Sequence, residues 1–131
     1  ANYPSITTTH TYDQRVETVE KVKTYGMSPC SGVIIGMGES NREIVEMAFA
    51  LRELGADSIP VNFLNAIPGT PLEKAGRTPA MKALKVLALF RFVCPSKEIR
   101  VAGGRAEGRS ICARFSLWRC MRPIPFLWAI I

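Results

Sequence analysis

The chain has 131 residues, of which 47% are apolar and 21% charged, and its net charge is +6. This composition predicts a folded domain rather than a disordered chain, but a complete eightfold barrel needs about 250 residues. Without a long apolar run or a charged-then-apolar leader, we expect neither a membrane span nor a secretory signal. The four cysteines include no CxxC pair, which argues against a zinc ribbon and favours a reducing, cytoplasmic setting.

The basic residues are concentrated near the end of the chain. Residues 1–104 hold 12 basic and 10 acidic side chains, whereas residues 105–131 hold five arginines, no lysine and one acid, Glu107. A basic tail can bind nucleic acid or a membrane surface. An arginine cluster without a recognised fold motif is more often simply solvated. We therefore expect no nucleic acid and no membrane as partners, and a non-enzymatic basic binding domain is kept as an alternative.

The first predicted helix begins after a polar, threonine-rich stretch. Thr11 and Gln14 have the spacing of a capping box, in which two side chains satisfy backbone N–H groups at the helix start. Gly26 can take the left-handed conformation that ends a helix. Residues 30–36 follow as a short apolar run rich in β-branched side chains. Such a run is typical of a strand buried on both faces in a parallel sheet.

A second helix and strand follow. Ser40 and Glu43 form another capping box, apolar residues then keep helical spacing, and Gly55 ends the pattern. Residues 58–64 alternate in the manner of a strand. Pro60 weakens this prediction, because proline cannot donate a hydrogen bond to a sheet ladder.

A turn at 69–71 leads to a third helix and strand. Thr78 followed by Pro79 predicts an N-cap and a first helical residue. Residues 81–93 are apolar on most faces, which predicts a helix packed on more than one side, and residues 98–102 form a short strand. The order helix–strand, three times over, indicates an α/β chain of βα units with a parallel sheet. The functional site of such a sheet lies beyond the carboxyl ends of its strands.

Four features of these elements could carry chemistry, each with a plainer interpretation beside it. The glycines of 32–39 allow a flat or anionic ligand to approach the backbone, or they form an ordinary strand-to-helix turn; their spacing is not GxGxxG. Cys30 is either a small buried apolar residue or a ligand. Arg100 is either paired with a carboxylate or used at a site. Asn62 is either a satisfied core amide or a ligand contact.

Taken together, these residues resemble the biotin synthase family. The resemblance runs in order over about residues 3–105 and includes Cys-Ser-Gly-Val-Ile-Ile-Gly-Met-Gly-Glu at 30–39 and Ile-Arg-Val-Ala-Gly-Gly-Arg at 99–105. It implies that residues 1–105 are the later βα units of a (β/α)8 TIM-type barrel. The parent would be a radical S-adenosylmethionine enzyme, a homodimer, that inserts sulfur into dethiobiotin to form biotin. Another radical synthase of the biotin- and thiamin-related group is the nearer alternative.

The resemblance also implies roles for individual residues. Cys30 matches a cysteine ligand of a [2Fe-2S] cluster that supplies sulfur, and Arg100 matches that cluster's arginine ligand. Asn62 matches a contact to dethiobiotin. The residues matching the segment near the adenine of S-adenosylmethionine are Ile34, Gly36 and Glu39.

Two features depart from the family. The CxxxCxxC loop, which would hold the [4Fe-4S] cluster that cleaves S-adenosylmethionine, is absent, so we expect this chain alone to be inactive and assign it no catalytic residue. Residues 106–131 do not resemble the family, and their composition suggests a frameshift near 106–110, which the DNA sequence would test. The cysteines that match no ligand position are Cys94, Cys112 and Cys120.

Overall fold

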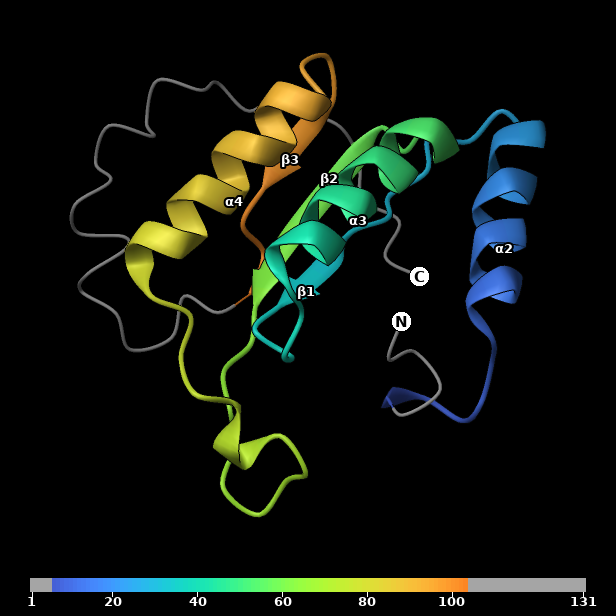
Figure 1. Ribbon diagram of the computed structural model, residues 1–131. Coiled ribbons are helices and arrows are strands. Elements are labelled where there is room, and N and C mark those ends of the chain that lie inside the picture. Colours follow the sequence, from blue (N-terminus) through green and yellow to red (C-terminus); the bar gives the residue numbers. More distant parts are fainter. Residues whose placement is uncertain (1–5, 104–131) are drawn as a thin grey trace.

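The computed structural model describes residues 6–103 of the chain. Within that range, helices and strands alternate (Figure 1): α2 (Tyr12–Thr24), β1 (Val33–Ile35), α3 (Asn41–Leu54), β2 (Ser58–Phe63), the 3-10 turn η1 (Glu73–Ala75), α4 (Ala80–Val93) and β3 (Glu98–Arg100). The predicted order of helices and strands is therefore confirmed. The arginine-rich segment 106–131 lies outside the described residues.

The strands form one parallel sheet in the order β1-β2-β3. Ile34 of β1 pairs with Asn62 of β2, and Pro60 of β2 pairs with Arg100 of β3. Before β1, Cys30 forms an isolated parallel bridge with Ser58. The α/β class and the parallel sheet are confirmed, and closure into a barrel stays a prediction.

The helices cover one side of this sheet. Figure 1 shows α3 and α4 next to each other in front of the strands, with α2 beyond α3. No residue of α2 is buried, and its contact with α3 includes a hydrogen bond of 3.3 Å from Lys23 Nζ to the carbonyl oxygen of Leu54. The core between sheet and helices consists of Ile35, Ile44, Ala48, Leu51, Ala56, Ile59, Val61, Phe63, Ala83, Val86, Leu87, Phe90, Val93, Cys94 and Ile99.

Two of the three predicted helix starts are confirmed. Thr11 and Ser40 each accept a backbone hydrogen bond within a complete capping box, and Gly55 ends α3 at φ 71°. The prediction for α4 was wrong by one residue. Pro79 stands at the N-cap position with extended backbone, and no side chain caps this helix. The Thr78 side chain lies instead next to the end of β1, where a Cβ on Gly36 would be 2.8 Å from Thr78 Oγ1.

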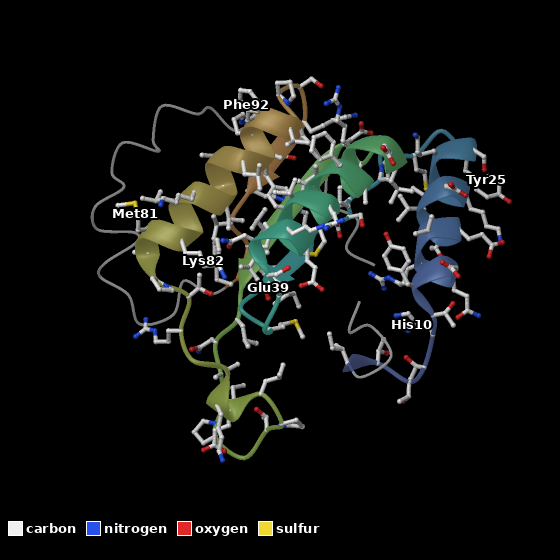
Figure 2. The ribbon with its side chains drawn as sticks, viewed as in Figure 1. His10, Tyr25, Glu39, Met81, Lys82 and Phe92 are labelled. Atoms are coloured by element: carbon white, nitrogen blue, oxygen red, sulfur yellow. The ribbon has the colours of Figure 1, made fainter. Side chains whose placement is uncertain are left out.

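The burial of β1 and α4 also differs from the prediction. β1 is buried on one face only: Ile35 is buried while Ile34 is 50% exposed. On α4, Met81 and Phe92 point away from the sheet (Figure 2) and Phe92 is 87% exposed. Both differences have one cause. Among the described residues the sheet is covered by helices on a single side, so a side chain that points away from that layer meets solvent.

The alternation predicted for β2 is confirmed. Ile59, Val61 and Phe63 are buried, and the residues between them are partly exposed. Pro60 is accommodated in this central strand even though it lacks an N–H group. β3 is shorter than predicted and ends at Arg100.

Candidate functional site

The sheet has a second face, opposite α3 and α4, which we call the free face. In parallel strands, paired residues point to the same side of the sheet. Since Ile59, Val61 and Phe63 point into the core, Asn62 and Pro60 point to the free face.

The predicted site residues come together on the free face. Ile34 stands beside Asn62, and Arg100 stands beside Pro60, because these residues are paired in register. Cys30 stands beside Ser58, its bridge partner. Four residues predicted from the sequence thus share one surface: Cys30, Ile34, Asn62 and Arg100.

Cys30 and Arg100 are in direct contact although they are 70 residues apart in the chain. Arg100 Nη2 donates a hydrogen bond of 3.4 Å to Cys30 Sγ. Cys30 is an exposed free cysteine, and Arg100 is partly buried. An exposed sulfur is open to a metal, and thiolates are the ligands that iron–sulfur clusters prefer. The structure therefore places side by side the two groups expected to hold a cluster, and their role as ligands stays a prediction.

Backbone contacts hold the segment of Cys30 against β2. Ser31 N donates to Ser58 O at 3.0 Å. Two residues along, Gly32 passes so close to β2 that an added Cβ would lie 2.0 Å from Pro60 O. Only glycine fits such an approach, and this contact explains why a glycine follows the cysteine so closely.

The loop after β1 is organised by Glu39. Its carboxylate accepts hydrogen bonds from the backbone N–H of Gly36 at 2.9 Å and of Met37 at 2.8 Å. Gly36 has φ 106° and Gly38 has φ 97°, values that L side chains rarely adopt. Glu39 thus shapes the loop at the carboxyl end of β1, where α/β proteins bind ligands.

Sequence reasoning missed Lys82, which joins this loop to α4. Its Nζ lies 3.9 Å from Glu39 Oε1. Figure 2 shows Lys82 in the first turn of α4, next to the loop that carries Glu39. Sequence reasoning also missed Asp57, which binds Lys97 and Ser28 at the start of β2. Both contacts join distant segments, so no local pattern indicated them.

The other described cysteine has a different environment. Cys94 is buried in the core, where its Sγ lies 3.8 Å from the carbonyl oxygen of Ala48. Burial raises the pKa of the Cys94 thiol and so disfavours the thiolate. Cys112 and Cys120 lie outside the described residues.

Residues 6–103 were searched for side chains that could together hold a metal ion. Within them, no group of three or more His, Cys, Asp or Glu side chains could hold a metal ion. In the same range, no helix is both long enough and apolar enough to span a bilayer. Any cluster at Cys30 would therefore need further ligands from outside these residues.

Comparisons with known proteins agree with the resemblance drawn from the sequence. Residues 60–113 match the model of the Biotin and Thiamin Synthesis associated domain. Over 104 residues, 79% of this chain, the sequence is 72% identical to the biotin synthase of Bacillus pumilus. Identity over the same length is 64% for that of Geobacillus thermodenitrificans and 62% for that of Halalkalibacterium halodurans. The chain spans 31% of the length of each of these relatives.

Proposed function

Because the chain belongs to the biotin synthase family over those 104 residues, we propose that it is a segment of an enzyme that inserts sulfur into dethiobiotin to form biotin. The observation that carries this proposal is the 3.4 Å contact between Cys30 Sγ and Arg100 Nη2. A thiol and a guanidinium from distant segments meet on the free face, beside the first residues of β2 rather than at its carboxyl end.

The residues present fit one part of a [2Fe-2S] site. Cys30 would ligate iron through its thiolate, and Arg100 would hold the neighbouring position through its guanidinium. When bound, the cluster would supply the sulfur that enters the product. The remaining ligands would come from outside the described residues, because those residues contain no group of three or more His, Cys, Asp or Glu side chains that could hold a metal ion.

Other residues of the free face would bind the organic ligands. The Asn62 amide can both donate and accept hydrogen bonds, which suits the ureido group of dethiobiotin. Ile34, half exposed beside it, would pack against the adenine of S-adenosylmethionine. Gly36 would let the ligand approach the backbone, and Glu39 would act indirectly, by holding the loop in shape.

We further propose that the described sheet is part of a (β/α)8 barrel and that the free face lines its interior. Parallel strands with helices on one side only are the arrangement of that barrel. The [4Fe-4S] cluster that would cleave S-adenosylmethionine needs the CxxxCxxC loop, which this chain lacks. The segment on its own should therefore form no biotin.

A thiamin-related radical synthase is the second candidate. The matching family model names both biotin and thiamin synthesis, so that match alone does not separate the two functions. The Cys30–Arg100 contact favours biotin synthase, because it provides ligands for a second cluster in addition to the one that cleaves S-adenosylmethionine.

A chimera tests the proposed function. The matching segment of the Bacillus pumilus biotin synthase is replaced by the corresponding residues of this chain, and biotin formed from dethiobiotin is measured anaerobically. We expect the chimera to make biotin, and we expect Cys30→Ala to lower turnover by at least about 100-fold through loss of a metal ligand.

The matched control is Cys94→Ala, which removes a thiol that lies in the core rather than on the free face. This variant should keep its activity. A folded chimera that makes no biotin, or a Cys30→Ala chimera as active as its parent, would contradict the proposal.

A further inference from the structure

Building on the proposed function, we infer that Asp57 is a positioning residue that holds Cys30 against Arg100. Asp57 lies immediately before β2, the strand between the segments that carry these two residues. It would act through the residues that precede Cys30 and Arg100 in the chain.

The Asp57 carboxylate binds one side chain from each neighbouring segment. Oδ2 accepts a hydrogen bond of 3.0 Å from Ser28 Oγ, two residues before Cys30. Oδ1 lies 2.9 Å from Lys97 Nζ, three residues before Arg100. One carboxylate therefore fixes the start of both segments relative to β2.

The backbone of Asp57 repeats this pattern. Its N–H donates to Pro29 O at 2.9 Å, on the Cys30 side. Its carbonyl oxygen accepts a hydrogen bond of 2.9 Å from Glu98 N, on the Arg100 side. Four hydrogen bonds from one residue thus join the two segments whose side chains meet at 3.4 Å.

The carboxylate is charged at neutral pH. The hydrogen bond from Lys97 is the largest effect and lowers the pKa of Asp57; burial opposes it, and the hydrogen bond from Ser28 lowers the pKa further by a smaller amount. The Asp57 side chain is nevertheless 48% exposed, and exposed ion pairs add little to overall stability. Its main effect is therefore on the relative placement of the two segments.

The Asp57–Lys97 pair differs from the ion pairs along single helices. Lys21 pairs with Glu17 and Arg42 pairs with Glu46, each within one helix at a spacing of four residues. Asp57 and Lys97 are 40 residues apart and lie immediately before different strands, β2 and β3. Only the second kind of pair can set the distance between segments.

The test compares two alkylating reagents on the full 131-residue chain without a cluster. The Cys30 thiolate attacks the CH2 carbon of iodoacetate or iodoacetamide and displaces iodide, but only iodoacetate is charged. Both rates at Cys30 are followed by mass spectrometry of the peptide that contains it. The rate with iodoacetate divided by the rate with iodoacetamide increases with positive charge beside the sulfur. Replacing the guanidinium by Arg100→Gln should lower this ratio about threefold, the size expected of an exposed charge interaction.

Asp57→Ala should also lower this ratio, as Arg100→Gln does. This sign is diagnostic, because simple removal of a negative charge would raise the ratio for an anionic reagent. Ser28→Ala, which changes no charge, should also lower it, and Asp57→Glu should restore part of the loss. The control Asp13→Ala, in the first turn of α2, should leave the ratio unchanged, and circular dichroism verifies that each variant is folded.

The inference is overturned if Arg100→Gln lowers the ratio while folded Asp57→Ala and Ser28→Ala do not. It also fails if Arg100→Gln itself has no effect, because the contact to be positioned would then be absent. The assay needs neither cluster nor turnover. A chimera that makes no biotin would thus contradict the proposed function and leave this result intact.

Discussion

The approach of the Cys30 segment to β2 depends on the absence of one side chain. A Cβ on Gly32 would lie 2.0 Å from Pro60 O and 2.7 Å from Pro60 Cγ. Real Cβ atoms do not come this close to a carbonyl oxygen, so the two segments would have to separate. Gly32 therefore controls both the pairing of β1 and the position of the thiol two residues earlier.

Gly32→Ala is expected to destabilise the fold by about 1–3 kcal/mol, the usual cost of overpacking a tight contact. The neighbouring change Ser31→Ala should cost no more than about 0.5 kcal/mol. Denaturant unfolding of the two variants measures the difference. Equal stabilities would show that β1 and β2 are not as close as described.

Asp57 gives the molecule a specific response to acid. Its pKa lies below its ordinary value of 3.8, chiefly because of the hydrogen bond from Lys97. The Asp57 carboxyl therefore loses its proton more readily in the folded state than in the unfolded chain. Its contribution to the free energy of unfolding is fully present at pH values above the ordinary pKa. It is lost as the pH falls through the pKa of the folded state.

The unchanged chain should have a higher free energy of unfolding than the Asp57→Asn variant. This difference should be largest near neutral pH and should shrink below about pH 4. Denaturant midpoints measured for both proteins across this range check the prediction. An advantage that grows on acidification would contradict the assigned sign.

At the scale of elements, local signals predicted the helices better than the strands. The capping boxes at Thr11 and Ser40 involve residues three apart, so the sequence alone was enough to place both helix starts. The exposure of Ile34 depends instead on which layers cover the sheet, and no local pattern records that. The start of α4 was misplaced because Thr78 lies beside Gly36 rather than on its own helix.

The cap of α3 can be removed by a single substitution. Ser40 Oγ accepts a hydrogen bond of 3.2 Å from Glu43 N. Ser40→Ala should cost about 0.5–2 kcal/mol of stability, whereas Ser40→Asp should retain most of it, because aspartate is also a good N-cap. Thermal unfolding of both variants tests this. Equal losses would show that the hydroxyl does not act as a cap.

Helix α4 offers a comparison between two phenylalanines. Phe90 is 0% exposed and Phe92 is 87% exposed. Phe90→Ala should lower the free energy of unfolding by about 3–5 kcal/mol through cavity formation. Phe92→Ala should change it by no more than about 0.5 kcal/mol. Similar losses in denaturant unfolding would contradict the described orientation of the helix.

At the scale of the whole molecule, the site depends on long-range contacts. The sequence identified Cys30 and Arg100 as unusual, and the family resemblance suggested that they act together. Residue patterns could not place them in contact, because their positions depend on three parallel strands in one register. The Asp57 contacts were missed for the same reason, since they join residues up to 40 positions apart.

The chain corresponds to less than a third of the length of the biotin synthases that it matches. The chain spans 31% of the relatives' length, and residues 6–103 contain no complete metal-binding group. If Cys30 and Arg100 hold a cluster as proposed, its remaining ligands would come from outside residues 6–103.

The most direct test of this account asks whether Arg100 touches the cluster. The chimera is grown with arginine labelled with ¹⁵N in the guanidinium group, its [2Fe-2S] cluster is reduced by one electron, and its electron–nuclear double resonance spectrum is recorded. If Arg100 is a ligand, the spectrum will show a ¹⁵N coupling that disappears in Arg100→Gln. A spectrum without such a coupling, or one that Arg100→Gln leaves unchanged, would contradict this account.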